Sequence, residues 1–304
     1  MNYYNTMHDL IGNTPMVKLN HIDAPEGVSI FAKLELYNPS GSVKDRTGKF
    51  MVEAAERSGL LKKGGTIVEG TAGNTGLGIA FAALNKGYDV IFVVPEKFSQ
   101  EKQTLMKALG AKIINTPREN GMLGAAAKAE EIKASIPGAI SLKQFENPAN
   151  PEAHYKTTGP EIYSALDGNI DYLVAGAGSG GTYTGIMKYL KEQNPDIQGI
   201  LADPIGSTMG GGEHKDYNIE GIGNDFIPKT MDMSLVDDVV KGPAVWTLRV
   251  RLLGDEPLRS GYGVVLVLVC YAVRRAGRIV PCRLRPTARR RRAVQPLPFY
   301  DAVP

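Results

Sequence analysis

Residues 38–46 read NPSGSVKDR and lead from a polar, glycine-containing loop into a predicted helix over residues 43–59. Lys44 falls in the first turn of that helix. A helix dipole places partial positive charge at this end, so a lysine here has the unfavourable sign. Burial and nearby positive charge would lower the pKa of such an amine and make it a nucleophile. A plain counter-charge for a bound anion is the alternative interpretation.

On both sides of this stretch, short apolar runs alternate with amphipathic segments. Strands are predicted over residues 28–36, 65–70, 89–97, 111–116, 171–178 and 197–203, and further helices over 77–87, 99–110, 121–135 and 179–195. This order indicates an α/β protein with parallel sheets covered by helices. Ligands bind in such sheets where strand ends meet helix N-termini, which selects the loops 38–44, 71–76 and 178–182.

The third loop lies in GAGSGGTYTG, residues 176–185, between a predicted strand and a predicted helix. Consecutive small residues let backbone N–H groups converge on an anion, and the helix dipole adds to their attraction. We interpret the loop as a phosphate site. The glycine spacing meets a dinucleotide fingerprint only in part, and a tight turn without a ligand is the other alternative.

The second loop lies in EGTAGNTGLG, residues 69–78, and carries donors on Thr71, Asn74 and Thr75. It is suited to a carboxylate or to a second phosphate, or it is an ordinary turn. Two anion loops together with Lys44 favour a ligand. Pyridoxal 5′-phosphate combines a phosphate with an aldehyde that condenses with lysine, so we predict it as the cofactor.

Five motifs in order carry a resemblance to a known family. NPSGSVKDR, EGTAGNTGLG, QFENPANP, GAGSGGT and EGIGNDFIP resemble those of the fold-type II pyridoxal-phosphate enzymes, above all cysteine synthase (O-acetylserine sulfhydrylase) and cystathionine β-synthase. The resemblance covers about residues 6–241. It implies two three-layer domains with mainly parallel twisted sheets, of the tryptophan synthase β type. The smaller, mobile domain would span residues 40–147, and the larger would combine 1–39 with 148–241.

The resemblance also assigns roles to individual residues. Lys44 would form the Schiff base and act in catalysis, and Asn74 would bind the 3′-oxygen of the cofactor. The phosphate would be held by Gly178, Ser179, Gly180, Gly181 and Thr182. The substrate carboxylate would be held by Thr71, Ala72, Gly73, Thr75 and Gln144. Gly221 would lie near the amino group of the substrate.

The implied reaction is β-replacement on O-acetylserine or serine with a thiol or sulfide, giving cystathionine or cysteine. Ala72 stands where a serine is common in the family, and Asp225 precedes Phe226 as in cystathionine synthases. Both departures favour homocysteine as the acceptor. A serine/threonine dehydratase and a catalytically impaired cofactor-binding protein are the alternatives. The resemblance further implies a homodimer and a serine acetyltransferase as partner.

The rest of the composition excludes several other classes. No apolar run approaches the roughly 20 residues that a membrane helix needs. The N-terminus lacks the basic and apolar parts of a signal peptide, so we expect a cytoplasmic protein without membrane or nucleic-acid partners. The two cysteines and four scattered histidines match no metal-ligand spacing, and we predict no metal.

The sequence changes character after Lys241. Residues 1–241 carry 20 Lys, 3 Arg and 29 acidic residues, a net charge of −6, whereas residues 242–304 carry 12 Arg, no Lys and 3 acidic residues, a net charge of +9. We interpret residues 242–304 as an atypical, loosely packed tail translated out of frame, with a natural basic tail as the alternative. The serine that contacts the pyridine nitrogen in the family is missing, and RSGYG at 259–263 replaces it poorly.

Overall fold

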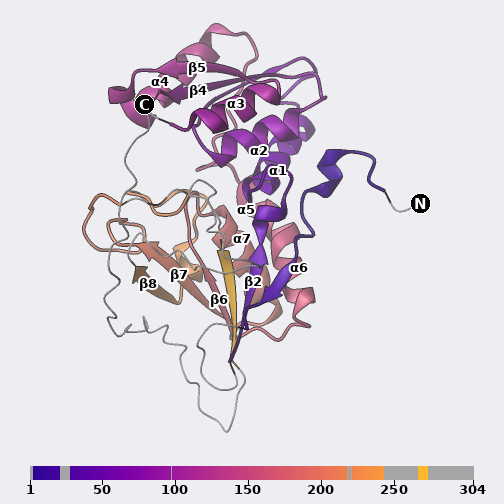
Figure 1. Ribbon diagram of the computed structural model, residues 1–304, viewed down its shortest axis with the longest axis vertical. Coiled ribbons are helices and arrows are strands. Elements are labelled where there is room, and N and C mark those ends of the chain that lie inside the picture. The colour runs from indigo at the N-terminus through magenta and orange to yellow at the C-terminus, as the bar shows by residue number, and fades with distance from the viewer. Residues whose placement is uncertain are drawn as a thin grey trace, which may run out of the picture.

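The computed structural model describes residues 3–20, 28–96, 98–217, 219 and 221–242, together with the backbone of 266–272. Two sheets, each with its own helices, form an upper and a lower unit in Figure 1. The two units have separate hydrophobic cores. None of the described helices is long and apolar enough to cross a membrane.

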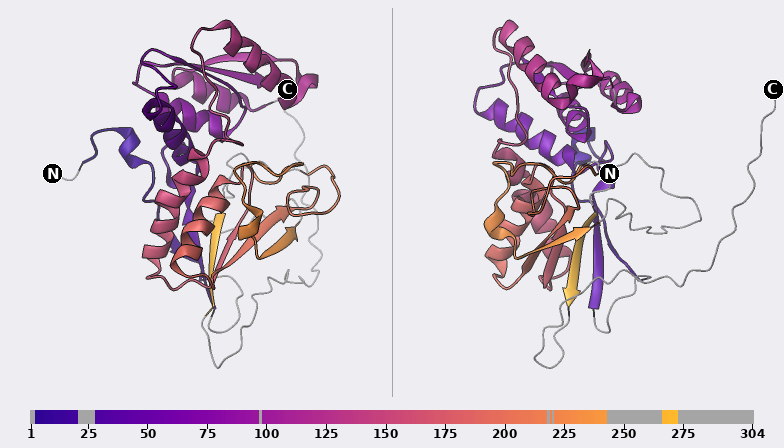
Figure 2. Two further views of the ribbon diagram at one scale, coloured as in Figure 1. Left: turned by 180° about the vertical axis from the view of Figure 1, so that it is seen from behind. Right: turned by 90° about the vertical axis from the view of Figure 1, so that its left-hand side faces the viewer.

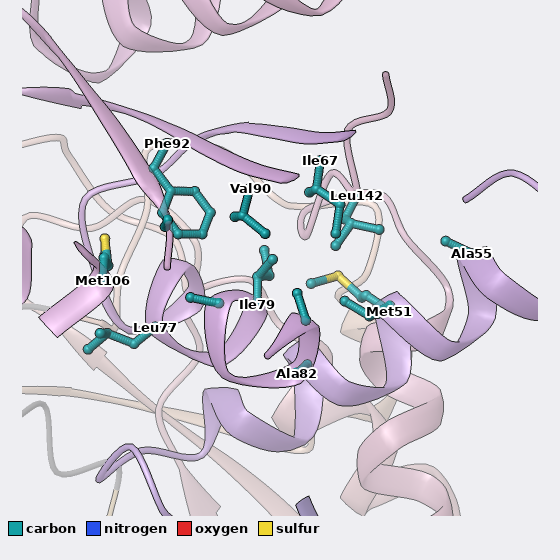
Figure 3. Packing of buried hydrophobic residues seen from close by; sticks show 14 of the residues in the cluster. Met51, Ala55, Ile67, Leu77, Ile79, Ala82, Val90, Phe92, Met106 and Leu142 are labelled. Carbon is teal, nitrogen blue, oxygen red and sulfur yellow. The ribbon is translucent and has the colours of Figure 1, made fainter. Parts of the chain in front are cut away.

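The upper unit is built on a three-stranded parallel sheet in the order β3-β4-β5. Its strands are β3 (Thr66–Gly70), β4 (Asp89–Pro95) and β5 (Lys112–Thr116), and its helices are α1 (Lys44–Arg57), α2 (Asn74–Ala83), α3 (Gln100–Ala108) and α4 (Gly121–Ser135), with a 3₁₀ turn η3 (Arg118–Asn120). Figure 3 shows Ile79 of α2 between Phe92 of the sheet and Met51 of α1. Buried aliphatic and aromatic side chains of this kind supply the main stabilisation of the unit.

The lower unit contains a six-stranded sheet in the order β1-β2-β9-β6-β7-β8. Its strands are β1 (Met16–Lys18), β2 (Val28–Leu34), β6 (Tyr172–Ala175), β7 (Gln198–Pro204), β8 (Asp238–Gly242) and β9 (Leu266–Ala272). β6, β7 and β8 are parallel, and β9 lies antiparallel to both β2 and β6, beside β2 in Figure 2. This sheet is therefore mixed.

Short helices cover the lower sheet and connect the two units. They are α5 (Ala149–Ala153), a π-helical turn η4 (His154–Thr158), α6 (Gly159–Ala165) and α7 (Gly181–Gln193), with 3₁₀ turns η1 (Met7–Leu10), η2 (Glu35–Tyr37) and η5 (Met233–Leu235). Ile162 of α6 and Tyr183 and Ile186 of α7 are completely buried against the strands. Helix α5 packs against both α1 and α7, so it joins the upper unit to the lower one (Figure 1).

The predicted α/β class is confirmed, and most predicted elements are present. α2 begins at Asn74, three residues before the predicted start, which places the end of the second candidate loop inside the helix. The helices over residues 149–165 were not predicted, because segments of five to seven residues are too short to show a helical period. The domain boundaries at residues 40, 147 and 241 and the mobility of the smaller domain stay predictions.

The predicted tail, residues 242–304, falls outside the described residues except for Gly242 and strand β9. The apolar run GVVLVLVC at 263–270 has β-strand composition and overlaps β9, whose backbone pairs over Leu266–Ala272. The RSGYG segment at 259–263 lies outside the described residues. The proposed frame error therefore stays a hypothesis.

Candidate active site

The start of α1 lies directly against α2, because glycines line the place where the helices cross. A Cβ atom on Gly78 would overlap the backbone carbonyl of Lys44, and one on Gly48 would overlap the backbone of Gly78. Only hydrogen at these positions lets the helices approach so closely. The contact brings Lys44 beside the 71–75 loop, which leads into α2.

The Lys44 amine has no hydrogen-bond or ion-pair partner within the described part of the chain, whereas its backbone N–H donates to Ser42 Oγ at 3.1 Å. Burial of the side chain lowers the pKa of Lys44 to about 8. The expected lowered pKa therefore follows from loss of solvation rather than from neighbouring cations or the helix dipole. A neutral, nucleophilic amine is far more populated here than on an ordinary lysine.

The loop before Lys44 is tied to the helix by Asp45. The Asp45 carboxylate accepts hydrogen bonds from the Ser40 hydroxyl and, at 2.7 Å, from the Ser40 backbone N–H. Burial raises the pKa of Asp45 to about 6, although the Ser40 hydrogen bonds act in the opposite direction. These bonds tie Ser40 to the first turn of α1, which carries Lys44.

Two positions after Lys44, the buried Arg46 guanidinium joins α1 to the lower unit. Arg46 Nε donates to Glu35 Oε2 at 2.7 Å, and Nη1 donates to Glu161 Oε1 at 2.6 Å. Burial disfavours ionisation of Glu161, but the hydrogen bonds and charges of Arg46 and Lys33 outweigh it and hold its pKa at about 2. The start of α1 is thus fixed to β2, η2 and α6 through buried ion pairs.

The loop at 178–182 has the geometry of an anion cradle. Gly180 is the N-cap of α7 with φ of +83°, and a Cβ there would press on Met231. A Cβ on Gly181 would overlap the Asn150 side-chain amide, and one on Gly178 would overlap the carbonyl of Gly221. The first-turn N–H groups of α7 have no acceptors within the helix, so the loop presents them to a ligand.

Polar side chains that were not predicted support this loop from behind. Asn150 Nδ2 donates to Ser179 Oγ at 2.9 Å, and His154 Nε2 lies 3.1 Å from Thr182 Oγ1. On the other side, Thr47 of α1 donates to Asn150 Oδ1 at 3.2 Å. Hydrogen bonds therefore connect α1, one turn after Lys44, with the anion cradle.

His154 is completely buried in this network. Burial, and then the positive charges of Arg46 and Lys44, keep its pKa well below the usual range. A neutral imidazole accepts on one nitrogen and donates on the other, which matches its hydroxyl neighbours Thr182 and Thr158. Asn150 lies in the quoted QFENPANP motif, but nothing in the sequence pattern marks it or His154 as part of the site.

The 71–75 loop faces Gln144. Thr75 Oγ1 donates to Gln144 Oε1 at 2.6 Å, and Asn74 begins α2 after the N-cap Gly73. Thr71 and Ala72 are buried at the end of β3. The first N–H groups of α2 have no acceptors within the helix, and together with these side chains they form a second polar cradle.

The 221–228 segment closes the cradle at 178–182. Gly221, with φ of +93°, places its carbonyl against Gly178, and the Asn224 side-chain amide donates to the Gly178 carbonyl. The Asp225 carboxylate lies 2.8 Å from Nδ1 of His214, and both side chains are exposed. The described residues include no cluster of His, Cys, Asp and Glu suited to a metal ion.

These features fit pyridoxal phosphate. The glycine loop at the start of α7 offers first-turn N–H groups to a phosphate, and the Lys44 amine, which has no partner among the described residues, suits an aldehyde. The second cradle at the start of α2 suits a carboxylate. All residues predicted for the site come from these cradles, from Lys44, or from Gln144 and Gly221 beside them.

The comparisons with known proteins agree with this geometry. The family described as "Pyridoxal-phosphate dependent enzyme" matches residues 7–247, and this match ends six residues after the change in composition at Lys241. The O-acetylserine dependent cystathionine beta-synthase of Bacillus subtilis (strain 168) is 51% identical over 231 residues, which are 76% of this chain and 75% of that protein. The cysteine synthase of Staphylococcus aureus (strain N315) is 45% identical over 234 residues, 76% of this chain and 75% of that protein.

A solved structure shows the same fold. The crystal structure of O-acetylserine dependent cystathionine beta-synthase from Helicobacter pylori superposes with a TM-score of 0.74 at 45% sequence identity. The superposition covers 80% of this chain and 80% of that chain. The shared fold extends over both sheets, since 80% coverage cannot be reached within either unit alone.

Proposed function

The chain belongs to the pyridoxal-phosphate dependent enzyme family, and on that premise we propose that it catalyses β-replacement on O-acetylserine or serine, with homocysteine as the thiol. The observation that carries the proposal is the Lys44 amine, which has no partner among the described residues and stands beside two anion cradles. The name of the Bacillus subtilis relative, an O-acetylserine dependent cystathionine beta-synthase, supports the choice of donor and product.

The cofactor would be held by three groups of residues. Gly178, Ser179, Gly180, Gly181 and Thr182 would bind its phosphate at the N-terminus of α7, and Asn74 would bind the 3′-oxygen. Lys44 would hold its aldehyde carbon. When bound, pyridoxal phosphate supplies a conjugated ring that accepts the electrons released at the α-carbon of the substrate.

The remaining residues would bind and orient the amino acid. Thr71, Gly73, Thr75 and Gln144 would hold its carboxylate, with Ala72 contributing only its backbone N–H. Lys44, once its amine is free, would take the α-proton, because burial keeps a usable fraction of this amine neutral. Closure of the 71–75 loop would exclude water and strengthen these hydrogen bonds.

Sulfide is the second candidate acceptor. The cysteine synthase of Staphylococcus aureus (strain N315) is 45% identical to this chain. Asp225 favours homocysteine, since its exposed carboxylate beside His214 lies on the segment that lines the cradle. An exposed carboxylate at this rim would suit the amino group of a larger thiol. The serine/threonine dehydratase is disfavoured, because the relatives named above carry out synthesis.

Product analysis decides between these acceptors. The purified protein is incubated with O-acetylserine or serine, each with homocysteine or with sulfide, and the products are separated by chromatography. We expect cystathionine to form faster than cysteine at equal thiol concentrations. A large excess of cysteine over cystathionine would show that sulfide is the preferred acceptor. Release of pyruvate without either product would identify a dehydratase.

The assembly and location belong to the same proposal. We propose a homodimer in the cytoplasm that also binds serine acetyltransferase. Light scattering on the purified protein tests the dimer, with a mass near twice the 32.8 kDa of the chain as the expected result. Co-purification with serine acetyltransferase, in the presence and absence of O-acetylserine, tests the partner.

A further inference from the structure

The Glu69 side chain, on β3, collects hydrogen bonds from three consecutive residues. Its Oε1 accepts from Ser141 Oγ at 3.0 Å, from Lys143 N at 3.1 Å and from the backbone N–H of Leu142. No lysine or arginine of the described chain forms an ion pair with this carboxylate. Glu69 therefore binds the segment 141–143 through hydrogen bonds and not a lysine or arginine side chain.

That stretch is the place where the chain leaves the upper sheet. Up to Ile140 the chain runs parallel to β3, with Val68 N donating to Ile140 O at 2.8 Å and Ile140 N donating to Thr66 O at 2.9 Å. Beyond Ile140 no further backbone pairing with β3 is present in the described residues. The backbone N–H groups of Leu142 and Lys143 therefore donate to the Glu69 carboxylate instead of to backbone carbonyls of β3.

The turn that follows contains a strained residue. Lys143 has φ of +51° without being a glycine, a conformation that costs about 1–2 kcal/mol for a residue with a Cβ. The turn is completed by Asn147 N, which donates to Lys143 O at 3.0 Å. Such a conformation persists only when surrounding contacts enforce it, and Glu69 supplies contacts to the N–H of Lys143 and to the two residues before it.

The turn places the Gln144 side chain against Thr75. Gln144 directly follows Lys143, and its Oε1 accepts from Thr75 Oγ1 at 2.6 Å. Thr71, at the other end of the same cradle, stands two residues after Glu69 in the chain. One carboxylate thus lies between the two segments that form the proposed carboxylate subsite.

We propose that Glu69 is a positioning residue for substrate binding, which holds the turn at 141–143 so that Gln144 completes the carboxylate subsite with Thr75. This inference rests on the proposed function, because it assigns Glu69 to the subsite for the carboxylate of the amino-acid donor. Glu69 acts through Gln144 and does not touch the substrate.

Four variants test this role: Glu69→Gln, Gln144→Ala, the double variant, and Glu146→Gln as the matched control. Glu146 belongs to the same turn but is exposed and pairs with Lys229. Binding of serine is followed through the visible absorbance of the cofactor-loaded protein. Loss of one hydrogen bond to a charged group predicts that Glu69→Gln raises the Kd for serine about tenfold, with the control unchanged. The change in kcat is expected to be smaller.

The double variant separates positioning from general damage. If Glu69 acts through Gln144, then Glu69→Gln adds no further loss of serine binding once Gln144→Ala is present. Fully additive losses would overturn the proposal. Glu69→Asp keeps the charge but shortens its reach, and it replaces Glu69→Gln if that variant does not fold, with the same expectations.

Hydrogen–deuterium exchange judges the inference independently of the reaction. In Glu69→Gln, peptides covering residues 139–147 should exchange faster, while peptides covering 176–184 keep the exchange of the parent protein. Unchanged exchange at 139–147 would refute the inference. A parent protein that binds neither serine nor O-acetylserine would refute the proposed function, and the exchange data would still decide the role of Glu69 in holding the turn.

Discussion

The buried Arg46 and the partly exposed Glu161 form an ion pair, Nη1 to Oε1 at 2.6 Å, across 115 residues of sequence. Arg46 belongs to the helix that begins with Lys44, and Glu161 belongs to α6 of the lower unit. The pair therefore fixes the start of the lysine-bearing helix to the unit that carries the anion cradle. If the smaller domain moves as the family resemblance implies, this end of α1 would move least.

Replacing Arg46 tests this anchor. Arg46→Met leaves the Glu35 and Glu161 carboxylates without their main partner, and breaking a buried pair of this kind costs about 3–5 kcal/mol in the free energy of unfolding. Urea denaturation measures the loss. Arg57→Met on the same helix is the control, because Arg57 is exposed and lies 3.8 Å from Glu53. An Arg46→Met protein as stable as this control would contradict the anchoring role.

Removing the Lys44 amine should abolish covalent attachment of the cofactor. The parent protein is expected to show a visible absorbance band and a reducible bond to pyridoxal phosphate, both lost in Lys44→Ala. Mass spectrometry after borohydride reduction locates the bond. Lys49→Ala, five positions along α1, should keep both signals, since the Lys49 amine lies near the His8 carbonyl rather than the cradles. A reducible cofactor that remains on Lys44→Ala would disprove the assignment.

The pKa of Lys44, lowered to about 8, predicts how attachment depends on pH. The neutral amine is the reactive form, so the rate at which cofactor-free protein takes up pyridoxal phosphate should rise with pH and level off above about pH 8. Below that value the neutral fraction falls about tenfold for each pH unit. Stopped-flow absorbance measures the rate, and a plateau that begins only near pH 10.5 would show an unperturbed lysine.

The same shift has a consequence for stability without cofactor. The unfolded chain binds the Lys44 proton more tightly than the folded chain does, so unfolding takes up a proton between about pH 8 and pH 10.5. The contribution of Lys44 to the free energy of unfolding therefore rises with pH across this window. Lys44→Met should remove that rise, which thermal unfolding of the cofactor-free proteins at several pH values would reveal.

Substitution at Gly181 should damage the anion cradle. A Cβ there overlaps the buried Asn150 amide, which itself holds Ser179, so Gly181→Ala must displace one of them. We expect the affinity for pyridoxal phosphate to fall at least tenfold, as measured by equilibrium dialysis. Gly59→Ala is the control for general glycine effects, because Gly59 has φ of +73° but no described residue lies within 4 Å of a Cβ there. Equal losses in both variants would count against a specific cradle.

The local elements and the chemistry of the two loops could be predicted from the sequence. Strand and helix periods, the glycines that precede α2 and α7, and Lys44 at the start of α1 are all encoded within windows of about ten residues. The five motifs likewise led to the family, which the matches at up to 51% identity then established. The roles assigned to the individual site residues stay predictions.

The supporting contacts were decided only by the tertiary structure. Asn150 behind Ser179, Glu69 at the 141–143 turn and Arg46 between Glu35 and Glu161 join segments 11 to 115 positions apart. The antiparallel place of β9 between β2 and β6 is of the same kind. The sequence pattern of one segment predicts whether that segment forms a helix or a strand. It does not predict which hydrogen-bond partner a buried polar side chain will have. Which partner that is depends on how the units pack, because burial and distance exist only in the folded chain.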